Sequence, residues 1–409
     1  MEDLLQNNRN SLNFRIRIEG TAVTMIQGRD IIIFGDDWGH YVSTIQHIGK
    51  ILSEQNRIIW IGSIGLRKPG FSLYDIKRIF GKLSKMITTS KTSVQSVKNI
   101  HQIFPLIVPF HDSESVYRYN MRNIRDSVME EIKKENVNDP IILSACPIIG
   151  ELVGTLGERS SYYICLDDWT KFDGAFDSIG LREQELLRKV TGVFSISEPL
   201  LHSRVPKSGN NFLLPQGVEI EHFIVTDEAS IPLDCNDQKP IVGFFGILSS
   251  WVDIDLIAYC AERLPEFSFV VIGKQNTDIS KFSQHPNISY IGEVPYADLP
   301  RYAKSFNAGL IPFKVNALTI ASNPIKLLEY LSLGIPVVST NLPEVKRHND
   351  IVYVAETNDE FVSFVKQAIE EQSAQKSEER KMRARKYSWR SVTETLSDRI
   401  LTWEQESRP

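Results

Sequence analysis

One stretch of this chain reads Thr319-Ile-Ala-Ser-Asn-Pro-Ile-Lys-Leu-Leu-Glu-Tyr-Leu-Ser-Leu-Gly-Ile-Pro-Val-Val-Ser-Thr340, which predicts a loop, a helix, a sharp stop and a strand. Asn323 is a good N-cap residue, and Pro324 follows at the first helical position, where its missing N–H costs nothing. Gly334 suits the position just past a helix, and Pro336 prevents the helix from continuing. Residues 337–340 then have the pattern of a short buried strand.

Lys326 breaks the local rules. It falls at the third helical position, where the helix dipole is positive and an acidic side chain would be preferred. The arrangement makes sense if an anion binds there, because N–H groups, dipole and ammonium would all converge on it. Glu329 lies one turn further along the same face. A phosphate on Lys326 and a hydroxyl-bearing group on Glu329 describe the diphosphate and ribose of a nucleotide; the alternative is an ordinary surface pair.

Residues 323–340 resemble the donor-binding helix of GT-B-fold glycosyltransferases. The resemblance is strongest to the bacterial branch that makes cell-surface polysaccharides, such as the teichuronic-acid and exopolysaccharide transferases, including glucuronosyltransferase-like members. It extends over residues 30–404, although the second half carries most of the motifs. It implies an α/β protein with two Rossmann-like domains, whose parallel sheets face an interdomain cleft with the acceptor site in the first domain and the donor site in the second.

Composition limits the functional classes. The 409 residues suffice for two domains, and a net charge of -5 argues against a dedicated nucleic-acid binder. The four cysteines are far apart and form no metal-binding cluster, which indicates a reducing compartment. The sequence has no apolar run long enough to span a bilayer and no signal-peptide pattern, so we expect a cytoplasmic protein.

The chain divides into five predicted segments. Residues 1–28 form an N-terminal extension, 29–224 the acceptor-side domain and 225–240 a polar linker. Residues 241–386 form the donor-binding domain, whose lysine-rich end we interpret as solvated helix. Residues 387–409 form a final helix, and the resemblance implies that it returns to the first domain.

The first domain opens with a βαβ unit. Residues 30–35 and 57–62 have the apolar pattern of parallel strands, and no GxGxxG follows the first of them. Side chains that follow such a strand lie where open α/β sheets bind ligands. The resemblance places this loop on the acceptor side, which makes Asp37, Trp38 and His40 candidates, with turn and cap chemistry as the alternative.

Two adjacent carboxylates, Asp167 and Asp168, follow the predicted strand 161–166. Carboxylates at the end of a strand that faces a cleft are candidates for acid–base work, and the alternative is a pair of capping aspartates. In the exopolysaccharide glucuronosyltransferases that this region resembles, the general base falls at Asp167. Asp168, the adjacent carboxylate, is the second candidate.

The resemblance also implies donor-side residues outside the organising helix. Gly246 ends a strand and would let a phosphate approach the backbone closely. Glu293 and Phe313 correspond to residues around the base and sugar of the donor, although core packing is an equal interpretation of Phe313. Asn323 and Ile325 complete this set beside Lys326 and Glu329. A literal DxD at residues 253–255 starts a helix and is interpreted as capping chemistry, so no metal site is expected.

Two departures bear on the mechanism. Many retaining relatives carry a glutamate eight residues before the ribose-binding glutamate, and that position is Ala321 here. This favours an inverting reaction with Asp167 as the base. The basic residue usual in the loop after Gly246 is also missing, since residues 247–251 offer only hydroxyls, so Lys326 would bind phosphate largely alone.

Residues 67–98 are rich in lysine and arginine, with apolar residues at spacings of three and four. This pattern is typical of a basic amphipathic helix, which can lie on an anionic membrane surface or simply form a solvated basic face.

The sequence therefore predicts a glycosyltransferase of surface-polysaccharide biosynthesis, peripheral on the inner membrane face. A nucleotide sugar would be its donor, a lipid-linked molecule or glycan its acceptor, and no metal or other cofactor would be required. A nucleotide-sugar epimerase of the same fold and a catalytically silent scaffold are the alternatives.

Overall fold

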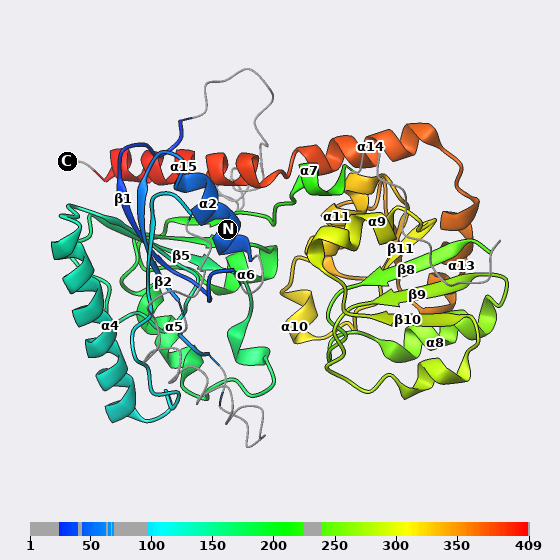
Figure 1. Cartoon of the computed structure of the whole chain (residues 1–409), viewed down its shortest axis with the longest axis horizontal. Helices are drawn as coiled ribbons and strands as arrows, with labels where there is room; N and C mark the ends of the chain where they lie inside the picture. The colour runs from blue at the N-terminus through cyan, green and yellow to red at the C-terminus, as the bar shows by residue number, and fades with distance from the viewer. Residues whose placement is uncertain are drawn as a thin grey trace, which may run out of the picture.

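The computed structural model describes residues 24–39, 43–62, 64–66, 68, 97–224 and 239–407, which form two α/β halves side by side (Figure 1). Most of the predicted N-terminal extension and residues 225–238 of the predicted linker lie outside the described residues, as does most of the basic stretch 67–98.

The first half is built on a sheet of seven described strands in the order β3-β2-β1-β4-β5-β6-β7, and the described pairs run parallel. Apolar side chains on both faces are buried, as expected of a parallel sheet covered by helices on both sides. The strands are β1 (Asp30–Phe34), β2 (Arg57–Ile61), β3 (Ile100–Ile103), β4 (Ile141–Ser144), β5 (Ser160–Cys165), β6 (Gly192–Ser195) and β7 (Asn211–Leu213). The helices are α2 (Thr44–Leu52), α4 (Glu114–Lys134), η2 (Trp169–Lys171), α5 (Ile179–Leu187) and α6 (Glu198–Ser203). The short helix α7 (Ile220–Phe223) follows β7 but packs against α11 in the core of the second half.

The second half is built on a sheet of six described strands in the order β10-β9-β8-β11-β12-β13, again with parallel pairs. The strands are β8 (Ile241–Phe245), β9 (Ser268–Ile272), β10 (Ile288–Gly292), β11 (Ala308–Ile311), β12 (Val337–Thr340) and β13 (Tyr353–Ala355). The helices are α8 (Ile254–Arg263), η3 (Ser280–Gln284), η4 (Tyr296–Asp298), α9 (Leu299–Ala303), α10 (Ala317–Ile320), α11 (Ile325–Leu333), α12 (Pro343–Lys346), α13 (Asn358–Glu370) and α14 (Ala374–Arg385).

The last helix, α15 (Trp389–Glu406), crosses back and packs against α2 and the first sheet (Figure 1). Two indole rings reach places that only glycine leaves open. A Cβ on Gly217 would lie 2.5 Å from the Trp389 ring, and a Cβ on Gly192 would lie 2.6 Å from the Trp403 ring. These contacts make α15 part of the core of the first half.

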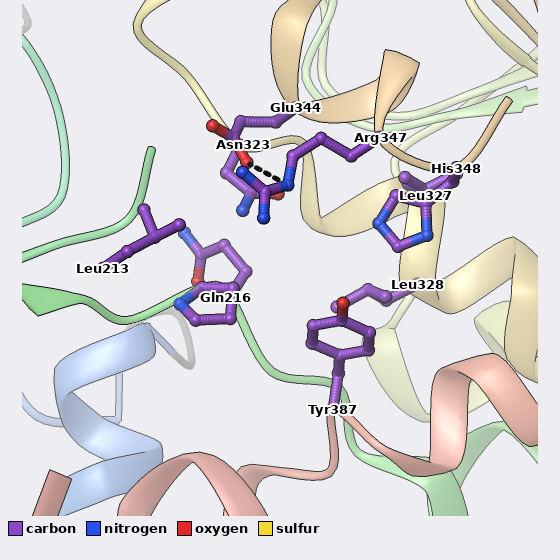
Figure 2. A pocket seen from close by; sticks show the side chains of 10 residues that line it. Leu213, Gln216, Asn323, Leu327, Leu328, Glu344, Arg347, His348 and Tyr387 are labelled. Carbon is purple, nitrogen blue, oxygen red and sulfur yellow. Dashed lines mark ion pairs between the residues drawn. The ribbon is translucent and has the colours of Figure 1, made fainter. Parts of the chain in front are cut away.

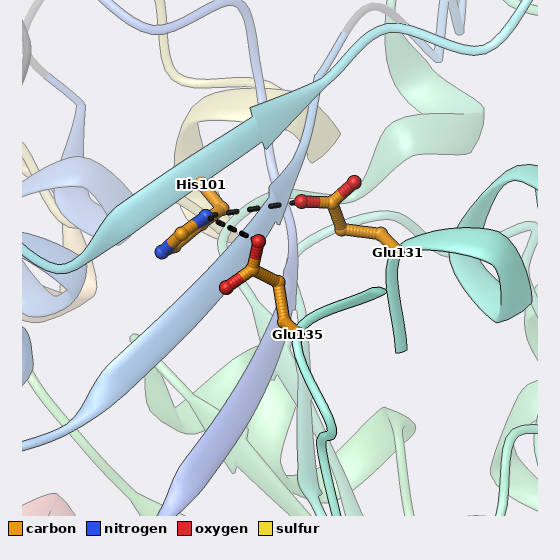
Figure 3. A group of neighbouring side chains, drawn as sticks. All are labelled: His101, Glu131 and Glu135. Atoms are coloured by element: carbon orange, nitrogen blue, oxygen red, sulfur yellow. Dashed lines mark ion pairs between the residues drawn. The ribbon is translucent and has the colours of Figure 1, made fainter. Parts of the chain in front are cut away.

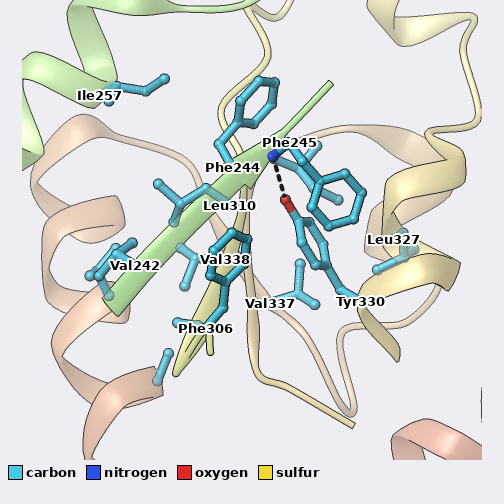
Figure 4. Packing of buried hydrophobic residues seen from close by; sticks show 14 of the residues in the cluster. Val242, Phe244, Phe245, Ile257, Phe306, Leu310, Leu327, Tyr330, Val337 and Val338 are labelled. Atoms are coloured by element: carbon cyan, nitrogen blue, oxygen red, sulfur yellow. Dashed lines mark hydrogen bonds between the residues drawn. The ribbon is translucent and has the colours of Figure 1, made fainter. Parts of the chain in front are cut away.

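Tyr330 anchors α11 to the second sheet (Figure 4). Its hydroxyl accepts a hydrogen bond from the Phe245 backbone N–H at 3.3 Å, and its ring occupies space that a Cβ on Gly309 would fill. A buried, hydrogen-bonded tyrosine fixes the rotation of a helix about its own axis. It therefore also fixes the direction in which the neighbouring Lys326 and Glu329 point.

Candidate active site

The start of α11 differs from the sequence prediction in one respect. The prediction that Asn323 caps the helix is wrong: the N-cap position is Pro324, and no side chain caps this end. The Asn323 amide instead donates to the Ile196 carbonyl of the first half at 3.0 Å. Lys326 is thus the second helical residue, one position earlier than predicted. Helix ends without a side-chain cap leave backbone N–H groups available to a ligand.

Lys326 lies across the carboxyl end of β8. A Cβ on Gly246 would be 2.0 Å from Lys326 Cε and 2.5 Å from Nζ, so the end of the lysine lies directly over this residue, whose φ of 139° also favours glycine. Gly273 lies tightly against Gly246, since a Cβ on Gly273 would be 1.9 Å from the Gly246 carbonyl oxygen. Burial lowers the pKa of Lys326, and the nearby Glu329 carboxyl opposes that shift. The lysine therefore points over the strand ends rather than into bulk solvent.

Glu329 is only 6% exposed, and burial raises its pKa to about 7 although Lys326 opposes the shift. Within the described residues no hydrogen bond or ion pair reaches its carboxylate, and Lys326 acts on it only as a nearby charge. The alternative of a surface pair between these two residues is therefore wrong. The Glu329 oxygens are not among the fully buried side-chain atoms without a partner, so this carboxyl can still be reached by a ligand hydroxyl and can accept its hydrogen bond.

The remaining donor-side candidates lie in different settings. Glu293 is exposed directly after β10, on the same edge of the sheet as Gly246. Phe313 belongs to the hydrophobic core of the second half, which agrees with its core-packing interpretation. Ile325 is partly buried against the core of the first half, so it packs between the domains.

The two aspartates after β5 differ sharply. Asp168 caps η2: its Oδ1 accepts from the Thr170 hydroxyl at 2.6 Å and from Arg204 Nη2 at 2.7 Å. Although burial raises the pKa of Asp168, these bonds hold it below its ordinary value. Arg204 also pairs with the buried Glu183 at 3.2 Å. The Asp168 carboxylate is thus engaged in hydrogen bonds that hold the loop, as its capping interpretation predicted. Asp167 precedes it at the end of β5 and is half-buried.

The loop after β1 lies on the same edge of the first sheet. Asp37 Oδ1 is 3.3 Å from where a Cβ on Gly62 would stand, so its carboxylate rests between the ends of β1 and β2. Trp38 packs edge-on against Trp60, with ring centroids 4.6 Å apart. His40 lies outside the described residues.

Contacts across the domain boundary were not foreseen in the sequence. The Ser197 hydroxyl donates to the Ala321 carbonyl at 2.6 Å, and the Glu198 N–H donates to Glu344 at 2.7 Å. Arg347 forms an ion pair with Glu198 and lines a pocket between the halves with Glu344 and Asn323 (Figure 2). Ala321 is 5% exposed and packs with the first half. The loop before α11 is therefore held by the first domain.

His101, Glu131 and Glu135 form the one metal-like group within the described part of the chain (Figure 3). His101 Nδ1 is 3.8 Å from Glu131 and 3.6 Å from Glu135, and Lys134 Nζ lies 2.9 Å from Glu131. The ammonium already balances the carboxylates, which favours an ion-pair cluster. It lies beside the edge strand β3, away from Lys326.

Among the described residues, no helix has the length and apolar character needed to cross a membrane.

Residues 239–371 match the family described as "Glycosyl transferases group 1". Part of the chain is 30% identical over 155 residues to a Bacillus subtilis protein named as the teichuronic acid biosynthesis glycosyltransferase TuaH. That match covers 36% of this chain and 39% of the relative, so it spans well under half of either protein. The second half of the chain is thus a glycosyltransferase group 1 domain.

Solved structures extend the comparison to the whole fold. HepE of Anabaena, solved in complex with UDP, has a TM-score of 0.62 at 12% identity and covers 91% of this chain and 100% of its own. Sucrose-phosphate synthase of Thermosynechococcus elongatus has a TM-score of 0.67 at 11% identity, with 93% and 100% covered. The chain has the GT-B fold, as its sequence predicted.

Proposed function

We propose that this protein is a glycosyltransferase that moves a sugar from a nucleoside-diphosphate sugar to an acceptor hydroxyl, with inversion at the transferred carbon. The observation that carries the proposal is Lys326, which is laid over Gly246 at an uncapped helix start. Holding an ammonium beside a positive helix end is unfavourable unless an anion binds there.

The donor would lie along the carboxyl ends of the second sheet. Its diphosphate would accept from the α11 N–H groups and from Lys326, and Glu329 would accept a ribose hydroxyl. As the bond to the leaving diphosphate breaks, negative charge grows on its oxygens, and the helix end and Lys326 are already placed to stabilise it. No divalent metal is needed in this scheme. HepE was solved with UDP, which makes a uridine nucleotide the first donor class to test.

Asp167 would take the proton of the acceptor hydroxyl while the oxygen attacks the sugar carbon from the face opposite the diphosphate. A retaining route is disfavoured because residue 321 is alanine, which offers no carboxylate. The named role of the Bacillus relative supports an acceptor from surface-polysaccharide assembly, either lipid-linked or a glycan. Residues 67–98 would then hold the cytoplasmic enzyme against the anionic inner face of the membrane.

Two measurements test this function. A thermal-shift screen against UDP, ADP, GDP and their glucose conjugates should raise the melting temperature for one nucleotide, since a ligand at a hundred times its Kd adds about 2.7 kcal/mol. Asp167→Asn should keep that shift but slow transfer by about 10²-fold or more. Asp177→Asn, at an exposed carboxylate, is the matched control. No shift with any nucleotide, or full transfer by Asp167→Asn, would contradict the proposal.

A further inference from the structure

A second interdomain pocket, of about 370 Å³, opens where three loops meet. Residues 171–173 of the first half line one side, and residues 249–251 and 316–318 of the second half line the other. The volume falls within the usual range of small-molecule sites. Because both halves contribute, the pocket exists only when the domains stand as they do here.

Two aromatic side chains meet in this pocket from opposite domains. The rings of Phe172 and Trp251 are 6.4 Å apart at an interplanar angle of 85°, and Trp169 supports Phe172 from behind at 5.5 Å. Both lining rings are half-buried, so they combine a fixed position with accessible surface. An aromatic face carries partial negative charge and attracts the weakly positive C–H groups of a saturated ring.

Polar groups surround these rings. Ser250 donates to Asp173 across the domain boundary at 2.9 Å, and Lys171 and Ser249 stand beside them. Asn316 caps α10 through its side-chain oxygen, at 3.0 Å from the Leu318 N–H. Apolar rings with hydroxyl, amide, carboxylate and ammonium groups around them fit a pyranose, which has C–H faces and a rim of hydroxyls.

The position of the pocket indicates whether it would bind the donor or the acceptor. Its first-domain wall begins four residues after Asp167, the proposed base, on the same loop. None of the donor-side residues Gly246, Lys326 or Glu329 lines it. The proposed function puts the donor on those residues, so this pocket is left for the molecule that brings the hydroxyl.

We propose that the pocket formed by residues 171–173, 249–251 and 316–318 binds a sugar ring of the acceptor, so that the enzyme extends an existing glycan and does not start one on a bare lipid phosphate. This rests on the proposed function. In the step, the acceptor O–H gives its proton to Asp167 and its oxygen bonds to the donor sugar carbon. The bond from that carbon to the diphosphate oxygen breaks, and its electron pair leaves with the diphosphate.

Saturation-transfer NMR tests the pocket directly. The probes are the methyl pyranosides of glucose, galactose, glucuronic acid and N-acetylglucosamine, each measured with UDP present. We expect at least one to receive saturation from the wild-type protein and from Tyr119→Ala, which removes an exposed ring on α4. Trp251→Ala should reduce that signal at least fivefold, and Trp251→Phe, which keeps a ring, should retain part of it.

The UDP melting shift, measured on the same samples, separates the two proposals. It should be unchanged in Trp251→Ala. No saturation of any pyranoside in the wild type, an equal signal in Trp251→Ala, or loss of the UDP shift in that variant would overturn the acceptor site. If neither UDP nor any other nucleotide shifts the melting temperature of the wild type, the donor proposal fails. A pyranoside signal that depends on Trp251 would in that case still show a sugar site.

Discussion

Replacing Lys326 by methionine should weaken nucleotide binding while leaving the ligand-free protein at least as stable. Methionine has nearly the same length and fills the space over Gly246. The variant loses a charge-assisted hydrogen bond to phosphate, worth about 1.5–3 kcal/mol. Since every 1.4 kcal/mol is tenfold in affinity, Kd should rise about 10- to 150-fold.

The effect on stability has the opposite sign. Burial lowers the pKa of Lys326, which means that the folded protein disfavours the charged form. The charged lysine therefore lowers the free energy of unfolding, and this loss disappears as pH rises from the lowered pKa of the folded state toward the ordinary pKa of lysine. Replacing Lys326 by an uncharged residue should remove the loss near neutral pH. The melting temperature without ligand should stay level or rise in Lys326→Met.

Titration calorimetry with the nucleotide found in the screen, together with thermal melts, checks both halves of this prediction. Lys366→Met on α13, at an exposed lysine, is the matched control and should change neither quantity. Unchanged affinity in Lys326→Met would refute the phosphate role. A melting temperature several degrees lower would instead show that Lys326 stabilises the fold, which would remove the reason for placing an anion there.

Three further outcomes follow from the structure. Burial raises the pKa of Glu329 to about 7, so the stability that this carboxyl contributes is complete below pH 4.5 and is lost as pH rises through 7. Melts between pH 5 and 8 should therefore fall more steeply in wild type than in Glu329→Gln, and parallel curves would contradict the shift. Arg204→Ala leaves Asp168 and Glu183 without their cation and should cost about 3–5 kcal/mol in urea unfolding; Arg188→Ala, at an exposed position, should cost little. Ala321→Glu buries a carboxylate against the first domain and should lower stability without creating a retaining enzyme, which the anomeric configuration of the product checks by NMR.

The local pattern of the sequence was enough to predict the fold and the helix that became α11. Apolar runs ending in glycine, joined by helices, indicated parallel sheets, and the conflict between Lys326 and the helix dipole singled out a candidate anion site. These signals lie within a few residues of one another, so they need no knowledge of distant partners.

Signals that depend on distant partners were missed. Asn323 fits a cap by every local rule, yet Ile196 of the other domain takes its amide. Ser197 caps α6, as its position before Glu198 and Pro199 suggests, yet its hydroxyl also donates to the Ala321 carbonyl of the other domain. The lysine-rich run before Lys386 was interpreted as solvated helix, but Arg380 within it is 1% exposed and its Nε donates to the Ile351 carbonyl at 3.0 Å. Such contacts join residues far apart in the chain and leave no periodicity to find.

The return of α15 has a consequence for biosynthesis. Domains usually fold in order as a ribosome releases them, but here Trp389, Leu396, Ile400 and Trp403 complete the core of the half that is translated first. The core of that half stays incomplete, with an apolar groove exposed, until α15 has been synthesised. The nascent chain is therefore exposed to aggregation throughout translation of the second domain, and chaperones that bind apolar segments would be expected to engage it during that interval.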